Sequence, residues 1–198
     1  MDKLRAAMAA RPDDVTGLAL LAQNEAALGN LAAAEAAQRQ LIAAKGDAAT
    51  ADDHAGLAEV MIRAAGGYVS PEAETALVKT LQLDPANGAA RYFSGLMFAQ
   101  GGRYDRAFAL WRGLIDEGPE DAPWIAPIRA QMAEVAYRAG VNYVLPPERG
   151  PDADDIAAAA EMSPEDRQAM IEGMVAQLSE RLATAGGPAE DWAKLIRA

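Results

Sequence analysis

The sequence predicts an all-α protein, built as a right-handed helical solenoid with a C-terminal helical extension. Three observations lead to this fold class. Apolar and small residues recur at every third or fourth position through most of residues 12–140, which is the spacing of one face of an α-helix. Alanine is abundant while aromatic and β-branched residues are few, a composition that favours helices. Glycines and prolines break the helical pattern at recurring intervals, as they do between the units of a helical repeat protein.

The clearest repeat spans residues 88–121, where two helical patterns flank a pair of glycines. Gly102 suits the left-handed turn between antiparallel helices because it has no Cβ. Gly95 in the first helix and Ala107 in the second are small residues that let the two helices approach closely. Trp111 lies on the apolar stripe of the second helix, so we expect it to be buried between them. This pattern resembles the tetratricopeptide repeat (TPR), a helix–turn–helix unit of about 34 residues.

Two similar units precede this repeat, at residues 13–46 and 51–85. The pair Asp13-Asp14 offers an N-cap to the first of these units. The 51–85 unit contains an extended turn, after which Ser70 can cap a helix that begins at Pro71. The apolar residues expected to face inward are Leu18, Leu21, Ala22, Leu28, Ala34, Leu41 and Ile42 in the first unit, and Leu57, Ala58, Met61, Ile62, Leu77, Leu81 and Leu83 in the second.

A single helix at residues 127–140 is expected to close the array, which therefore covers residues 1–140. Residues 141–162 combine prolines, glycines and clustered aspartates, and this composition is typical of an acidic linker. Residues 163–198 form a C-terminal helical segment, which begins with the capping pair Ser163-Pro164. The helical pattern is still running at the last residue, so we expect the natural chain to continue beyond it.

Charge and composition argue against several classes of function. The net charge of −11 disfavours nucleic-acid binding, which needs a basic face, and contact of this segment with an anionic membrane. No apolar run approaches the roughly 20 residues that a membrane-spanning helix needs. The lack of cysteine removes disulfides, thiolate metal ligands and cysteine nucleophiles.

The motifs of catalytic and metal sites are also missing. His54 is the only histidine, and without partner ligands or a CxxCH or HExxH motif it is assigned to a helix surface. Ser94 lacks the GxSxG surroundings of a hydrolase nucleophile and is assigned to packing. The aspartates at 152–155 do not continue to the glutamate of an EF-hand, so they are assigned to the solvated linker. We therefore predict a protein that is not an enzyme and that binds no cofactor or metal.

Four segments resemble the CcmI/CycH family of cytochrome c maturation proteins. They are residues 64–73, which hold the extended turn, and residues 83–85, 92–111 and 121–124. The resemblance implies the periplasmic TPR domain of a protein that is anchored in the inner membrane. It also implies a chaperone that holds apocytochrome c by its C-terminal helix for the other haem-ligation components of the maturation system.

A partner groove is expected along the first helix of each repeat, which lines the concave face of TPR arrays. Positions adjacent to the small residues Ala22, Ala58, Gly95 and Ala133 give the candidates. Their mixture of small, apolar and polar side chains suits a bound amphipathic helix, and it also suits packing between repeats. The predicted groove residues are Gln23, Glu59, Arg63, Tyr92, Leu96, Gln100, Glu134, Tyr137 and Arg138.

Two functions stay open on these grounds. The first is a periplasmic chaperone that binds apocytochrome c. The second is a generic TPR scaffold that assembles a complex in the envelope or the cytosol. Membrane helices upstream of this segment would favour the first.

Overall fold

The computed structural model describes residues 1–119, 121–147 and 163–185. The chain divides into two compact units, Met1–Pro146 and Pro147–Ala198, which are described separately. The described residues contain helices and no strand. This confirms the predicted fold class, an all-α TPR-like solenoid.

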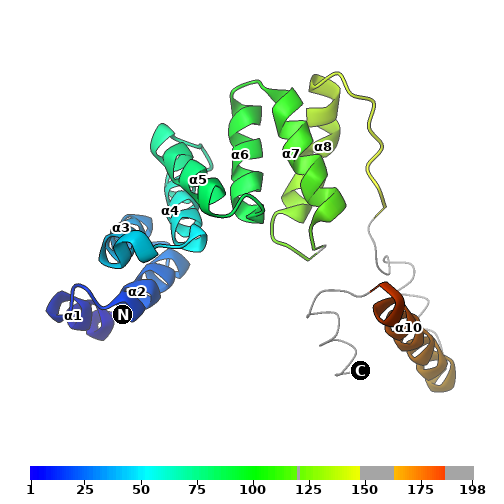
Figure 1. The fold of residues 1–198 in the computed structure, drawn as a ribbon, viewed down its shortest axis with the longest axis horizontal. Coiled ribbons are helices and arrows are strands. Elements are labelled where there is room, and N and C mark those ends of the chain that lie inside the picture. Colours follow the sequence, from blue (N-terminus) through cyan, green and yellow to red (C-terminus); the bar gives the residue numbers. More distant parts are fainter. Residues whose placement is uncertain (120, 148–162, 186–198) are drawn as a thin grey trace. The chain divides into compact units, whose positions relative to one another are not determined.

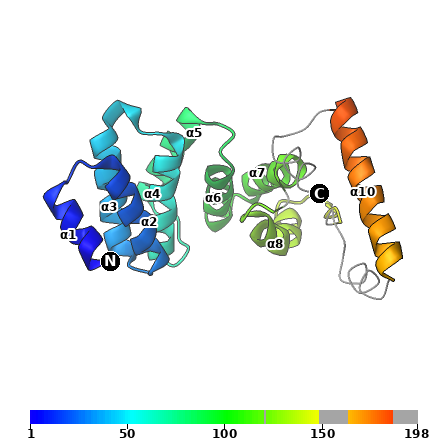
Figure 2. The same ribbon diagram turned by 90° about the horizontal axis from the view of Figure 1, so that it is seen from below.

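The first unit is a row of antiparallel helices (Figures 1 and 2). Its closest packing is within the pairs α2–α3, α4–α5 and α6–α7, and α8 packs on α7. We call α2, α4, α6 and α8 the first helices. In chain order the elements are α1 (Asp2–Ala10), α2 (Val15–Ala27), α3 (Leu31–Lys45), a 3-10 turn (Gly46–Ala48), α4 (Ala51–Ala64), α5 (Pro71–Leu83), α6 (Gly88–Gln100), α7 (Tyr104–Glu117) and α8 (Ile125–Arg138).

Short polar side chains cap four helices of the first unit, α2, α4, α5 and α6, and the caps of α2 and α5 are ones that the sequence predicts. Asp14 accepts a hydrogen bond of 3.0 Å from the backbone N–H of Gly17 at the start of α2. Ser70 caps α5, which begins at Pro71. Helix α8 begins at Ile125, two residues before the predicted start at 127. Pro127 is tolerated there because the N–H groups of a first turn have no partner within the helix.

Trp111 and Gly95 bring α6 and α7 into close contact. The side chain of Trp111 is fully buried, at 0% exposure. A Cβ atom added to Gly95 would lie only 2.3 Å from the indole nitrogen Nε1 of Trp111. Only glycine therefore fits at this crossing, which confirms the predicted role of Gly95. The same core cluster continues into α8 through Ile128, Met132, Val135 and Ala136.

Two predicted core positions are wrong. Leu28 is 59% exposed and Leu83 is 47% exposed. Each lies at the C-terminal end of a helix. The predicted apolar stripe reaches Leu28 by a step of six residues from Ala22, and it reaches Leu83 by a step of two residues from Leu81. Such steps rotate a side chain well away from the face that residues three or four apart share. The other apolar residues predicted in these two units are buried or half-buried.

Residues beyond α8 continue along the first unit as an extended segment. The ring of Tyr143 packs edge-on against Phe108 at a centroid distance of 5.2 Å. Leu145 contacts the same core cluster, and the guanidinium of Arg129 donates a 2.6 Å hydrogen bond to the carbonyl oxygen of Pro146. The start of the predicted linker therefore covers apolar surface of α7 and α8.

The second unit is described by one helix, α10 (Pro164–Ala185). The hydroxyl of Ser163 accepts a hydrogen bond of 3.1 Å from the backbone N–H of Asp166, so Ser163 caps this helix as predicted. The remainder of the predicted linker, 148–162, and the predicted helical residues 186–198 lie outside the described residues. No helix within the described ranges has the length and apolar character needed to cross a membrane.

Candidate functional site

Three concavities lie between successive first helices of the array. The N-terminal pocket lies between α2 and α4, and has a volume of about 660 Å³. The central pocket lies between α4, α6 and the segment before α8, at about 150 Å³. The C-terminal pocket lies between α6 and α8, at about 360 Å³. Glu59 lines both the N-terminal and the central pocket, so these two are neighbours along α4.

The N-terminal pocket is lined by small side chains and by charged ones. Ala19, Ala22 and Ala26 of α2 form one wall, and Gln23 lies beside them. Across from them, Arg63 of α4 donates a hydrogen bond of 3.1 Å to the carbonyl oxygen of Ala26, which ties the two first helices together. Arg63 is also 3.7 Å from the carboxylate of Glu59, in an ion pair that is about half exposed.

Half of the residues that line the central pocket are aromatic, and the full lining is Glu59, Ala89, Tyr92, Phe93, Pro123 and Trp124. The ring of Tyr92 stacks on Trp111 at a centroid distance of 6.0 Å and lies 5.0 Å from the ring of Phe93. Burial raises the pKa of Tyr92. This phenol is therefore neutral at physiological pH and contributes apolar surface to the pocket.

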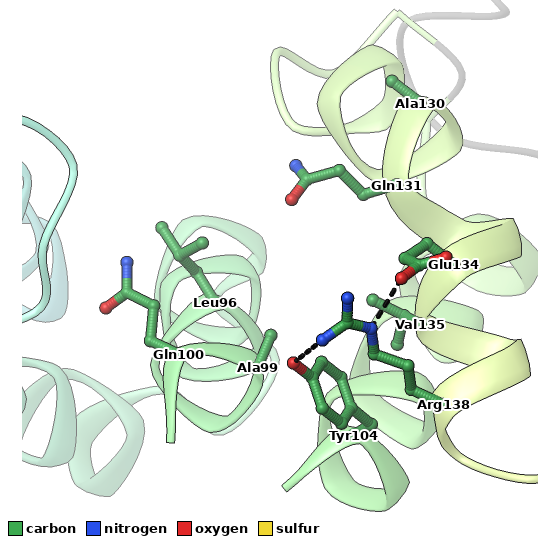
Figure 3. A pocket seen from close by; sticks show the side chains of 9 residues that line it. All are labelled: Leu96, Ala99, Gln100, Tyr104, Ala130, Gln131, Glu134, Val135 and Arg138. Carbon is green, nitrogen blue, oxygen red and sulfur yellow. Dashed lines mark hydrogen bonds and ion pairs between the residues drawn. The ribbon is translucent and has the colours of Figure 1, made fainter. Parts of the chain in front are cut away.

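The C-terminal pocket contains a fixed arginine (Figure 3). The guanidinium of Arg138 donates to the carboxylate of Glu134 at 2.5 Å and to the hydroxyl of Tyr104 at 2.8 Å. It also lies over the Tyr104 ring, 5.1 Å from the centroid. Glu134 and Tyr104 raise the pKa of Arg138. Leu96 and Ala130 supply apolar surface on the facing helices, so the pocket pairs an oriented cation with apolar walls.

Gln100 lines the C-terminal pocket, but its amide group is used within the fold. Its Nε2 donates a hydrogen bond of 2.8 Å to the carbonyl oxygen of Gly67, and its Oε1 accepts one of 3.1 Å from the N–H of Val69. The amide therefore holds the extended turn between α4 and α5 against the end of α6. A partner can contact the flank of Gln100 without using its hydrogen bonds.

Eight of the nine predicted groove residues line one of these three pockets, and Tyr137 does not. Tyr137 is 80% exposed. Ala133, from which the positions on α8 were counted, is exposed as well. The pocket residues that the sequence reasoning missed include the aromatic side chains Phe93, Tyr104 and Trp124. Trp124 and Tyr104 belong to segments outside the first helices, and only their packing brings them to the pockets.

Ionisable groups near the N-terminal pocket serve the fold. Burial alone would raise the pKa of Asp53, but hydrogen bonds from Lys45 and Thr50 outweigh it and lower the pKa. His54 is half-buried, and burial together with the charge of Lys79 lowers its pKa. Among the described residues, no three histidine or acidic side chains are grouped so that they could hold a metal ion.

No protein-family model matches the chain, but two curated proteins are similar to nearly all of it. It is 38% identical over 191 residues to the cytochrome c-type biogenesis protein CycH of Rhizobium meliloti strain 1021, a match that covers 96% of this chain and 49% of that protein. It is 35% identical over 187 residues to the protein of the same name from Bradyrhizobium diazoefficiens, covering 94% of this chain and 48% of that protein. The chain thus spans about half the length of the curated relatives it matches.

Proposed function

The chain belongs to the CycH family of cytochrome c-type biogenesis proteins, and from this premise we propose that it acts in cytochrome c biogenesis as a chaperone. In this role it holds an apocytochrome c by its C-terminal helix while haem is ligated. The observation that carries the proposal is the succession of pockets along the first helices. A helix that crosses these pockets meets apolar side chains interspersed with charged ones, which is the chemistry of a groove that binds an amphipathic helix.

The chemistry of the pockets supports binding that is chiefly apolar. Leu96, Ala130 and Tyr92 supply apolar surface from α6 and α8. Arg63 and Arg138 are held by neighbouring oxygens, so they can orient carbonyl or carboxylate groups of a partner at little cost in side-chain entropy. The net charge of −11 attracts basic segments over a Debye length of about 8–10 Å. Salt should therefore slow association more than it weakens the complex.

The proposed setting is the periplasm, in a full-length protein anchored in the inner membrane. Apocytochromes c and the other haem-ligation components of the maturation system are the proposed partners. The support is the family membership, since both relatives are named as cytochrome c-type biogenesis proteins.

The test is a titration of an apocytochrome c C-terminal peptide against the wild type and two variants in which an alanine of α8 is replaced by arginine. Ala130 is exposed and lines the C-terminal pocket, so Ala130→Arg should fill the pocket and weaken binding by about tenfold or more. Ala126 is exposed one turn earlier on α8 and lines none of the three pockets. Ala126→Arg therefore adds the same charge as a matched control, and it should bind like the wild type.

Two results would reject the proposal. Equal binding by Ala130→Arg and Ala126→Arg would place the peptide elsewhere. Binding of folded holocytochrome as tightly as the apo form would exclude a chaperone that must release its product, and would favour a general scaffold instead.

A further inference from the structure

We propose that the central pocket is an anchor site, which receives one aromatic or long aliphatic side chain of the partner while a lysine or arginine one helical turn away pairs with Glu59. This inference rests on the proposed function, because it specifies the partner chemistry that the groove selects. It assigns a specificity role to Phe93, Trp124 and Glu59.

The size and walls of the cavity indicate a single apolar side chain. Its volume of about 150 Å³ is well below the roughly 300 Å³ at which small-molecule sites begin. Three aromatic side chains, Tyr92, Phe93 and Trp124, come from two separate elements and meet there beside Pro123. Aromatic surfaces of this kind gain most from a large apolar or aromatic partner group.

The walls are held in place by the rest of the fold. A Cβ atom added to Gly88 would lie 2.2 Å from the ring carbon Cζ2 of Trp124, so the indole packs directly on the start of α6. Tyr92 is fixed on the other side by its stacking on the buried Trp111. A site whose rings are already ordered loses little conformational entropy when a side chain enters.

Glu59 supplies the charge at the pocket. Its side chain is half exposed, and its ion pair with Arg63 is long, at 3.7 Å. Arg63 has a shorter hydrogen bond, of 3.1 Å, to the carbonyl oxygen of Ala26. An exposed pair of this geometry is weak, so Glu59 can accept a cation of the partner while Arg63 stays bound to α2. A basic residue next to the apolar anchor therefore complements this part of the groove.

The experiment uses the full chain and a designed basic amphipathic helical peptide that is unrelated to any cytochrome. The peptide carries one phenylalanine on its apolar face, with lysines one turn before and after it. Replacing that phenylalanine by alanine should weaken binding by about tenfold or more, as expected for one large buried side chain. Ala89 is half-buried in the wall of the pocket, so the larger side chain of Ala89→Phe should fill the pocket. This variant should bind the phenylalanine and alanine peptides with equal affinity. Ala109→Phe on the exposed face of α7 is the matched control, and it should still bind the phenylalanine peptide more tightly than the alanine peptide.

A charge exchange protects the test against misfolding of Ala89→Phe. Glu59→Lys should weaken binding of the lysine peptide, and a peptide with glutamates in place of those lysines should recover it. Recovery by a changed peptide requires a folded protein and a direct contact. Equal affinity of the wild type for the phenylalanine and alanine peptides, including binding of neither, would overturn the anchor site. Failure of Glu59→Lys to bind either the lysine peptide or the glutamate peptide would overturn it as well.

The two proposals fail in different ways. If the designed peptide shows the anchor effect and the apocytochrome peptide does not bind, the anchor site stands and the cytochrome partner is wrong. If the apocytochrome peptide binds and is blocked by Ala130→Arg, but neither Ala89→Phe nor loss of the phenylalanine matters, the partner stands and the anchor site is wrong.

Discussion

The indole nitrogen of Trp111 donates a hydrogen bond of 3.0 Å to the backbone carbonyl oxygen of Tyr92, 19 residues earlier in the chain. This carbonyl belongs to α6 and the indole to α7, so the bond joins the two helices of the central repeat. The ring of Tyr92 also stacks on the indole ring of Trp111. Because Tyr92 lines the central pocket, the core of this repeat and the wall of the candidate groove are one packing unit.

Trp111→Ala should lower the free energy of unfolding by about 3–5 kcal/mol, since it removes a fully buried large aromatic side chain and leaves a cavity. Denaturant unfolding followed by circular dichroism measures this loss. Tyr137→Ala is the control, because the Tyr137 side chain is almost fully exposed and its removal should change stability by less than about 0.5 kcal/mol. Similar stability of both variants and the wild type would contradict the assignment of Trp111 to the core.

Gly95→Ala should be destabilising although alanine is the better helix former. The added methyl group would lie 2.3 Å from the indole Nε1 and 2.6 Å from Cδ1 of Trp111, so α6 and α7 must separate, at a cost of about 1–3 kcal/mol. Gly173→Ala in α10 is the opposite case, because no atom outside its own helix backbone lies within 4 Å of the new Cβ. Gly173→Ala should therefore not lower the stability of the protein. A gain in stability for Gly95→Ala would show that the helices can part without cost.

Glu25 should make the array sensitive to acid. The guanidinium of Arg5 donates to both its oxygens, at 2.6 and 2.8 Å, and Asn30 donates a third bond of 2.8 Å. These bonds lower the pKa of Glu25 from 4.5 to about 2. A lowered folded-state pKa stabilises the protein fully above pH 4.5, and this contribution is lost as the pH falls from about 4.5 to 2.

The check is thermal unfolding of the wild type and Glu25→Gln at a series of pH values between 2 and 7. Glu25→Gln should have a lower melting temperature than the wild type at neutral pH. This difference in melting temperature should shrink as the pH falls from about 4.5 to 2. Glu74→Gln, at an exposed position of α5, serves as the control. A difference in melting temperature that stays constant with pH would mean that the carboxylate charge of Glu25 does not contribute to stability.

Gln100→Ala should loosen the extended turn between α4 and α5. It removes the acceptor of the Val69 N–H and the donor to the Gly67 carbonyl, and each such bond contributes about 1 kcal/mol. Hydrogen exchange of the Val69 amide should therefore become faster than in the wild type. Gln82→Ala, on the exposed side of α5, should leave that exchange rate unchanged. Equal rates in all three proteins would show that the turn holds itself.

Local sequence signals predicted the helices and their faces. Helical spacing marked buried residues such as Leu18 and Trp111, and capping residues such as Ser70 marked where helices start, because both signals act over one or two turns of chain. The misplaced residues, Leu28 and Leu83, lie where a helix ends. At that point the spacing no longer specifies which way a side chain faces.

The sequence by itself determined an all-α repeat array, and it picked out eight of the residues that line the pockets between the first helices. Tertiary structure alone decided how those residues are used: Gln100 is tied to a turn, Arg138 is held by Tyr104, and Trp124 completes an aromatic pocket. These relationships join residues more than 30 positions apart. They depend on the distance and angle between packed helices, which the spacing of residues within one helix does not specify.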